Sequence, residues 1–406
     1  MTDKLNYRKT FVLGFGFFAI SLVWPLYNFY VPLFLSDYIG SQFWINAVMT
    51  IDNIMAVTLI PLFGNLSDRT KTRFGRRMPF LIFGIPISAF LFTLLPNYSS
   101  FLSLMIILIT LNLAMAVFRA PTIALMPDIT PKDQRSKANG IINFMGGLAS
   151  VLVLSVGAIL FDINKILPFI STAVLMIFSL FLLVKFIKEP ETVVNEETHE
   201  KVKLFHTIKE IFQEKDTTAR NILFAIFFWF VGYNGIEATF SRYSVEFLKI
   251  KASTGSLILS TFAASFLIFA IPSGFIATKI GKKRTIKIGI IGLIITFGFL
   301  AFVRNNTVFL SLNFSTIMII LMALGGFFWA CININSYPMV VEKAEEKKVG
   351  TFTGIYYFFS MLAAILGPLF FGLFVDLIGF ETMFVVASVS FVFALISIIM
   401  IRDKNR

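Results

Sequence analysis

Long apolar stretches follow one another along almost the whole chain of 406 residues. A hydrocarbon core about 30 Å thick is crossed by a helix of roughly 20 apolar residues. Lipid offers the backbone no hydrogen-bond partners, so the crossing segments must be helical. We therefore predict an all-α membrane protein with twelve transmembrane helices, at residues 11–35, 43–65, 80–96, 100–126, 138–161, 167–187, 220–248, 255–278, 285–303, 308–338, 349–375 and 380–401.

Positive charge is concentrated in alternate connections between these stretches. Of the 35 lysine and arginine residues, 29 fall in, or within three residues of, the termini and connections that would share one face of the membrane, and four fall in the other connections. Cytoplasmic loops carry such an excess. We therefore expect a multi-pass protein of the plasma or inner cell membrane with both termini in the cytoplasm. The net charge of +12 then reflects orientation in the lipid bilayer, and no nucleic-acid partner is expected.

One long polar segment divides the chain. Residues 188–218 are rich in charge and separate six predicted spans from six others. This arrangement predicts an N-terminal six-helix bundle at 1–187, a cytoplasmic linker, and a C-terminal six-helix bundle at 219–406. The halves share short patterns about half a chain apart, such as GIINF from Gly140 and GIYYF from Gly354. Because transporters with alternating access are built from such repeats, we expect two pseudo-symmetric bundles.

The connection between the second and third spans has the sequence GNLSDRTKTRFGRRMPF, at residues 64–80. Its glycine would let two helices approach closely, and Asp68 would cap a neighbouring helix or pair with an arginine. Such contacts would hold one conformation of a transporter closed and break in the other. The alternative is that the loop serves only to set the topology of the chain in the membrane. The predicted gating residues are Gly64, Asp68, Arg69, Arg73, Gly75, Arg76, Arg77, Asp128 and Arg135.

This connection resembles the loop signature of the major facilitator superfamily. Its RFGRR and PF segments resemble more narrowly the sucrose:proton symporters and the related glycoside–pentoside–hexuronide:cation symporters. Three further stretches agree: WPLYNFYVP at 24–32, FRAPTIALMPDITPKDQRSKANG at 118–140, and the region 329–357. The resemblance implies a major facilitator fold and a monomeric carrier of a disaccharide or glycoside such as sucrose or maltose. The coupling ion would be H⁺ or Na⁺, with no other cofactor.

Charged residues lie well inside three apolar spans. A charge at the centre of a bilayer costs about 2.5–3.5 kcal/mol. Asp52, Arg119 and Glu237 must therefore either form ion pairs or serve the function of the protein. No histidine lies in a predicted span, so proton coupling would depend on Asp52 or Glu237, with Arg119 as a competing partner. A permanent ion pair is the alternative. Arg242 and Glu246 are spaced as a helical i, i+4 pair, which we interpret as a surface pair.

Amide and aromatic side chains within the spans suit a sugar. Amides match hydroxyl groups, and an aromatic face stacks on a pyranose ring. Hydrogen bonding between helices is the alternative for the asparagines and tyrosines, and packing is the alternative for the tryptophans. The predicted substrate-binding residues are Trp24, Tyr27, Asn28, Asn53, Arg119, Asn143, Asn234, Trp329, Asn333 and Tyr357.

Other functions remain open at this point. A sodium-coupled glycoside symporter and a non-transporting membrane sugar receptor fit the same pattern. A drug:proton antiporter usually has a Gly-Pro-x-x-Gly motif in its fifth span, and residues 138–161 contain no proline. An enzyme is not expected, because no nucleophile–base pair or phosphate loop is found. His199 and His206 lack other ligand groups nearby, and Cys331 is the single cysteine, so no metal site or disulfide is expected.

Overall fold

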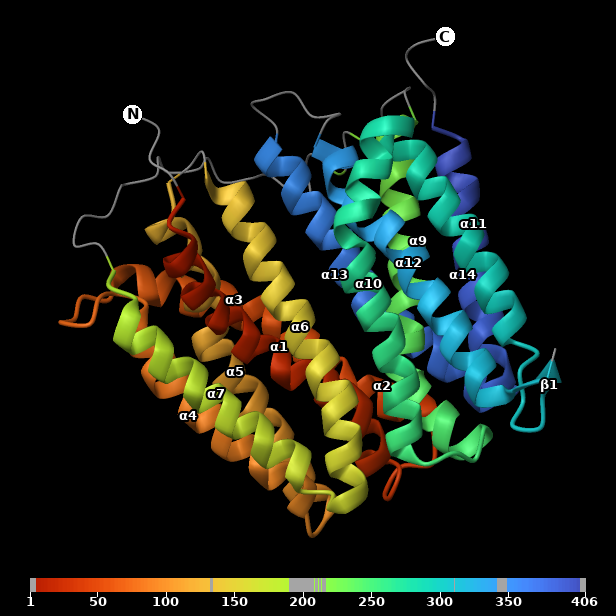
Figure 1. Cartoon of the computed structure of the whole chain (residues 1–406), viewed down its shortest axis with the longest axis horizontal. Helices are drawn as coiled ribbons and strands as arrows, with labels where there is room; N and C mark the ends of the chain where they lie inside the picture. The colour runs from red at the N-terminus through yellow and green to blue at the C-terminus, as the bar shows by residue number, and fades with distance from the viewer. Residues whose placement is uncertain are drawn as a thin grey trace. The chain divides into compact units, whose positions relative to one another are not determined.

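The structure is a computed structural model that is almost entirely helical (Figure 1). Most of the predicted linker, with both histidines, lies outside the described residues. These are residues 5–131, 134–189, 208, 211, 213, 217–309, 311–341 and 349–401.

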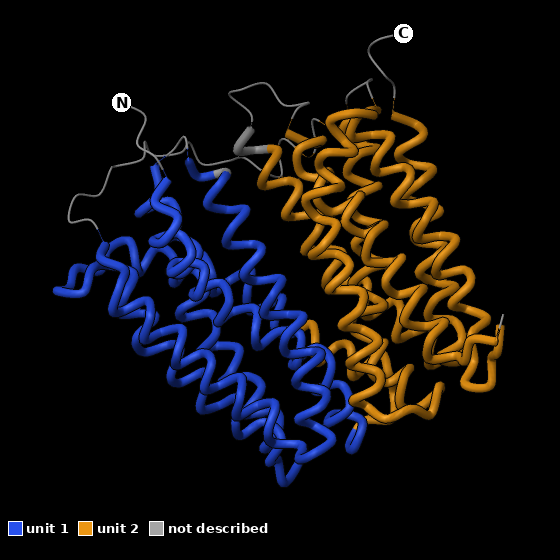
Figure 2. The backbone as a smooth tube through the Cα atoms, in the orientation of Figure 1, with its two compact units in different colours: residues 1–38, 51–196 blue, residues 39–50, 197–406 orange. Residues whose placement is uncertain are grey.

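The chain divides into two compact units, which Figure 2 shows in different colours. The first unit consists of residues 1–38 and 51–196, and the second consists of residues 39–50 and 197–406. This grouping differs from the predicted domains at residues 39–50, which follow the first span along the chain but pack with the second unit.

Six long helices make up the described part of the first unit. They are α1 (Tyr7–Leu35), α3 (Ile51–Arg69), α4 (Met78–Leu94), α5 (Phe101–Ile129), α6 (Arg135–Ile163) and α7 (Leu167–Phe186), with a short 3-10 turn η1 (Leu95–Asn97) after α4.

The described part of the second unit also contains six long helices. They are α9 (Thr218–Arg242), α10 (Ala252–Ile280), α11 (Lys282–Leu300), α12 (Phe314–Val341), α13 (Val349–Leu377) and α14 (Met383–Ile399). The shorter elements are α2 (Gln42–Met49), the π-helical turn η3 (Tyr243–Phe247), the hairpin of β1 (Val308–Phe309) and β2 (Leu312–Asn313), and the 3-10 turn η5 (Phe380–Thr382).

The predicted spans largely agree with these helices. Among the described residues, eleven helices are long and apolar enough to cross a membrane. Helix α11, which corresponds to the predicted span 285–303, is not one of them, because its first six positions contain four basic residues, Lys282, Lys283, Arg284 and Lys287. The helix expected at 308–338 begins only at Phe314, since β1 pairs with β2 just before it and Asn313 accepts a hydrogen bond from the Thr316 N–H at 2.9 Å.

The predicted second span, 43–65, is broken in two. Helix α2 ends at Met49, and α3 begins at Ile51. The hydroxyl of Thr50, between them, donates to the Ala47 carbonyl at 2.8 Å. The break places Asp52 in the first turn of α3, where a carboxylate interacts favourably with the helix dipole.

Small residues let the helices of each unit approach closely. In the first unit, a β-carbon at Gly84 of α4 would lie 2.8 Å from the β-carbon of Phe118 in α5. In the second unit, a β-carbon at Gly326 of α12 would collide with the Phe262 carbonyl of α10. Such close backbone approach is a common basis of helix association in lipid.

Helix α2 is held to the second unit by polar contacts. The Asp376 carboxylate, at the end of α13, accepts hydrogen bonds from the backbone N–H groups of Gln42 and Phe43 at 2.7 and 3.0 Å. It also accepts one from the Ser41 hydroxyl at 2.5 Å. Asp376 therefore caps the N-terminus of α2, and Asn46 in α2 donates to the Pro368 carbonyl of α13 at 2.7 Å.

Arg242 makes the other main contact with α2, and our interpretation of it as a surface residue was wrong. Its side chain is 6% exposed. It pairs with Glu246 at 2.5 and 2.8 Å, and it donates to the Gln42 amide oxygen at 2.9 Å and the Gly40 carbonyl at 3.3 Å. The partners from residues 40–42 are some 200 positions away in sequence, so the i, i+4 spacing alone did not reveal the burial.

Replacing Arg242 should therefore destabilise the second unit. Removing one partner of a buried ion pair typically costs about 3–5 kcal/mol, because the other charge is left without compensation. We expect Arg242→Gln to lower the melting temperature of the detergent-solubilised protein by more than about 5 °C. The matched control is Lys251→Gln, at an exposed position in the same unit. Equal melting temperatures for the two variants would contradict this assignment.

Candidate functional site

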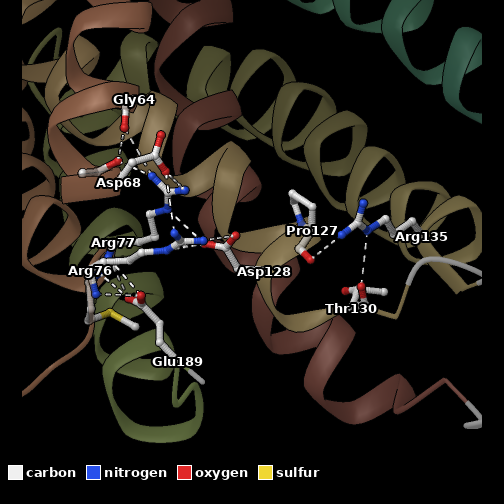
Figure 3. Close-up of polar contacts among 11 residues, drawn as sticks. Gly64, Asp68, Arg76, Arg77, Pro127, Asp128, Thr130, Arg135 and Glu189 are labelled. Carbon is white, nitrogen blue, oxygen red and sulfur yellow. Dashed lines mark hydrogen bonds and ion pairs between the residues drawn. The ribbon is translucent and has the colours of Figure 1, made fainter. Parts of the chain in front are cut away.

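The side chain of Arg77, at the start of α4, contacts three of the other predicted gating residues, Gly64, Asp68 and Asp128 (Figure 3). This side chain is 5% exposed. Its guanidinium donates to the Asp68 carboxylate, to the Ser67 hydroxyl at 2.5 Å and to the Gly64 carbonyl at 3.3 Å. It also donates to Asp128, at the end of α5, at 3.0 Å. One arginine thus ties the end of α3 to the end of α5 in the first unit.

Arg76 reinforces the same contact. Its guanidinium binds both carboxylate oxygens of Asp128, at 2.6 and 3.2 Å. Two arginines therefore share Asp128, whose side chain is 14% exposed. Charge-assisted, two-pronged contacts of this kind are among the stronger hydrogen bonds in proteins.

Glu189 belongs to this cluster although it was not among the predicted gating residues. Its carboxylate accepts from the backbone N–H groups of Arg76, Arg77 and Met78 at 2.6–3.0 Å, so it caps the N-terminus of α4 (Figure 3). Gly75, with φ of 103°, brings the backbone close to this carboxylate, and a β-carbon there would lie 2.5 Å from the Glu189 carboxyl carbon. The fit explains why a glycine stands at this position.

The remaining predicted gating residues lie apart from Arg77. Arg135, at the start of α6, donates to the Pro127 and Thr130 carbonyls at 2.9 and 3.4 Å, near the C-terminus of α5 where a cation is favourable. Arg69 is exposed, and Arg73 is exposed with its guanidinium 4.8 Å from the ring centroid of Phe74.

A second group of predicted residues meets inside the first unit. The Arg119 guanidinium of α5 lies 5.5 Å from the ring centroid of Trp24 in α1, within the range of a cation–π interaction. The rings of Trp24 and Tyr27 meet edge to face at 5.6 Å. Asp52, in the first turn of α3, accepts a hydrogen bond from the Asn53 N–H at 2.5 Å. Helices α1 and α5 thus bring a guanidinium and two aromatic rings together, in the unit that also contains Asp52.

Asn112 of α5 also belongs to this group, and sequence reasoning missed it. Its amide donates to the Tyr27 hydroxyl at 3.1 Å, with both residues buried. The other predicted amides of this unit are more peripheral: Asn28 and Asn53 are half-buried, and Asn143 is exposed. Asn112 stands alone in an aliphatic stretch, and only its position inside a span marks it as unusual.

In the second unit, the predicted residues gather around Tyr233. Its ring stacks on Trp329 of α12 with centroids 4.4 Å apart and planes 3° from parallel, and its hydroxyl hydrogen-bonds to Glu237. Phe230 meets Trp329 edge-on at 5.6 Å. Trp329 is 3% exposed, so in this conformation Tyr233 covers one of the faces that we expected to stack on a sugar.

The other predicted residues of this unit have local or partial contacts. Asn234 donates to the Phe230 carbonyl one turn earlier at 2.7 Å. Asn333 is half-buried, and Tyr357 is exposed beside Tyr356, with ring centroids 5.4 Å apart. Glu237 is therefore joined to an aromatic pair in the second unit.

Sequence comparison identifies the family. The profile of the Major Facilitator Superfamily matches residues 13–306 and 245–406. The chain belongs to the major facilitator superfamily. It is a membrane transporter rather than an enzyme, and this family membership agrees with the two bundles of long apolar helices described above.

Individual relatives are distant. The chain is 26% identical to the uncharacterized symporter YnaJ of Bacillus subtilis, over 94% of this chain and 84% of that protein. It is 28% identical to the uncharacterized symporter sll1374 of Synechocystis, but over only 34% of this chain and 28% of that protein. It is 24% identical to the class H tetracycline resistance protein of Pasteurella multocida, over 87% and 84% of the two chains.

Among solved structures, the nucleoside transporter NupG has the same fold. It superimposes with a TM-score of 0.74 over 98% of this chain and 100% of that chain, at 16% sequence identity. This similarity supports the major facilitator fold and carries no information on the cargo.

Proposed function

We propose that this family member is a proton-coupled symporter of a disaccharide or glycoside that works as a monomer by alternating access in the cell membrane. The observation that carries the proposal is the meeting of Arg119 with Trp24 and Tyr27 inside the first unit, which also holds Asp52 in the first turn of α3. A carboxylate can bind and release the driving proton, and Arg119 competes for its charge. The aromatic rings and amides nearby suit a ring-shaped, hydroxyl-rich cargo.

Two further features support this assignment. The relative that covers most of the chain is named a symporter. In the second unit, Glu237 repeats the combination of a carboxylate with an aromatic pair. We assign the Arg77 cluster to gating, because its ion pairs can hold the ends of α3 and α5 together in one conformation and release them in another. Sodium would act through the same carboxylates if it replaced the proton.

A drug:proton antiporter is the second candidate, and the similarity to a tetracycline resistance protein favours it. Counterflow in proteoliposomes separates the two, because exchange of labelled for unlabelled cargo needs no ion gradient. We expect one of sucrose, maltose or melibiose to exchange, and tetracycline not to. Exchange of tetracycline alone would favour the antiporter, and saturable sugar binding without exchange would indicate a receptor.

A further inference from the structure

The connection between α10 and α11 repeats the connection that Glu189 caps in the first unit. In the first unit, Gly75 has a φ of 103°, two arginines follow it, and the Glu189 carboxylate accepts from the next three backbone N–H groups at 2.6–3.0 Å. In the second unit, Gly281 has a φ of 88°, and Lys282 and Lys283 follow it as the first residues of α11. Both connections therefore place a glycine with positive φ and two basic residues at the start of a helix.

The start of α11 needs a negative charge that its own first turn does not supply. This turn has no acidic residue and contains Lys282, Lys283 and Arg284. The first N–H groups of a helix have no acceptor within the helix, and the helix dipole makes cations unfavourable there. Gly281 leaves room for an acceptor, since a β-carbon there would have no atom of the other described residues within 4 Å. A carboxylate at this point would satisfy the N–H groups and offset the basic side chains.

The sequence after α14 contains a counterpart of Glu189. Residues 187–189 after α7 read Ile-Lys-Glu, and residues 401–403 after α14 read Ile-Arg-Asp, 214 positions later. The same separation relates Gly140 to Gly354 in the repeated pattern of the two halves. The two isoleucines are both buried, at 4% and 5% exposure. The repeat therefore assigns an acidic residue to the same place after the last helix of each unit.

A hydrogen bond holds the end of α14 to the start of α11. The Lys283 ammonium group donates to the Ile401 carbonyl at 2.7 Å. Asp403, which lies outside the described residues, follows Ile401 by two positions. Two residues extend the chain by at most about 7 Å. Asp403 is therefore tethered close to the helix start that lacks an acidic residue of its own.

We propose that the Asp403 carboxylate caps the N-terminus of α11, as Glu189 caps the N-terminus of α4. It accepts hydrogen bonds from the backbone N–H groups of residues 282–284 and offsets the charge of their side chains. The residues after α14 thereby secure the connection between α10 and α11. Each unit then holds its basic connection with a carboxylate that follows its last helix, and this inference does not depend on the cargo or the coupling ion.

Hydrogen–deuterium exchange of the intact protein, in a detergent free of anionic lipid, tests the cap. Because the first N–H groups of a helix lack partners within it, protection of residues 282–284 requires an acceptor from elsewhere. Loss of a capping side chain should speed exchange of these amides about fivefold in Asp403→Ala and leave residues 76–78 unchanged. Glu189→Ala should have the reverse effect. Lys404→Ala, at the next position, is the matched control and should change neither set.

Each outcome of this experiment decides the proposal. Protection of residues 282–284 in the wild type that is lost in Asp403→Ala would support it. Amides that exchange freely in the wild type, or equally slowly in Asp403→Ala, would overturn it. The phosphate of an anionic lipid headgroup is the competing anion. Protection that appears only in nanodiscs containing phosphatidylglycerol, and equally in wild type and Asp403→Ala, would assign the start of α11 to lipid and overturn the role of Asp403.

Discussion

Asp52→Asn is expected to abolish accumulation of the sugar while leaving exchange of sugar across the membrane intact. An amide keeps the size and most of the hydrogen bonds of the carboxylate but cannot take up a proton at physiological pH. For one proton per sugar, an imposed gradient of about two pH units can drive accumulation of about a hundredfold. The variant should reach an internal-to-external ratio of about one under the same gradient.

Paired measurements of gradient-driven uptake and counterflow would check this expectation. Asp37→Asn is a suitable control, because Asp37 is a carboxylate of the same unit that hydrogen-bonds to Tyr98 outside the helices. Full accumulation by Asp52→Asn would show that Asp52 is not the coupling group. If Glu237→Gln then lost accumulation, the coupling site would be assigned to the second unit.

Asp128→Asn is expected to have the second large effect, through the Arg77 cluster. Asp128 is shared by Arg76 and Arg77, and the side chain of Arg77 is almost fully buried. Removing the shared charge leaves two guanidinium groups with weaker partners, and breaking a buried ion pair costs about 3–5 kcal/mol. We expect uptake to fall at least about tenfold and the melting temperature to fall with it.

The control for Asp128→Asn is Arg73→Gln, because Arg73 lies in the same connection as Arg76 and Arg77 but is exposed and outside the cluster. A role only in membrane topology predicts that both variants reach the membrane in the same orientation and transport alike. Normal uptake by correctly oriented Asp128→Asn would therefore exclude gating by this cluster. Reduced uptake with unchanged topology would support it.

Much of the fold could be predicted because the membrane imposes a simple length rule. A run of about 20 apolar residues must be a helix in lipid, and this rule located the spans. The rule did not locate the break between α2 and α3, because this break changes the apolar character of the surrounding stretch too little to be read from composition.

The site was harder to predict because its contacts join distant parts of the chain. Asp52, Arg119 and Trp24 could be proposed from the sequence because charge and large aromatic rings inside a span are conspicuous. Glu189 was missed because it follows the last apolar span of its half and resembles an ordinary linker residue, yet it caps a helix more than 110 positions earlier. Asn112 was missed because one amide gives no indication of which helix it faces.

Uptake of labelled sucrose, maltose and melibiose into proteoliposomes tests the central claim most directly, first under an imposed pH gradient and then under a sodium gradient. We expect one of these sugars to accumulate above its external concentration when the pH gradient is applied. Accumulation under the sodium gradient alone would keep the symporter but replace its ion. No accumulation of any of the three under either gradient, with tetracycline moving against the proton gradient instead, would contradict the account.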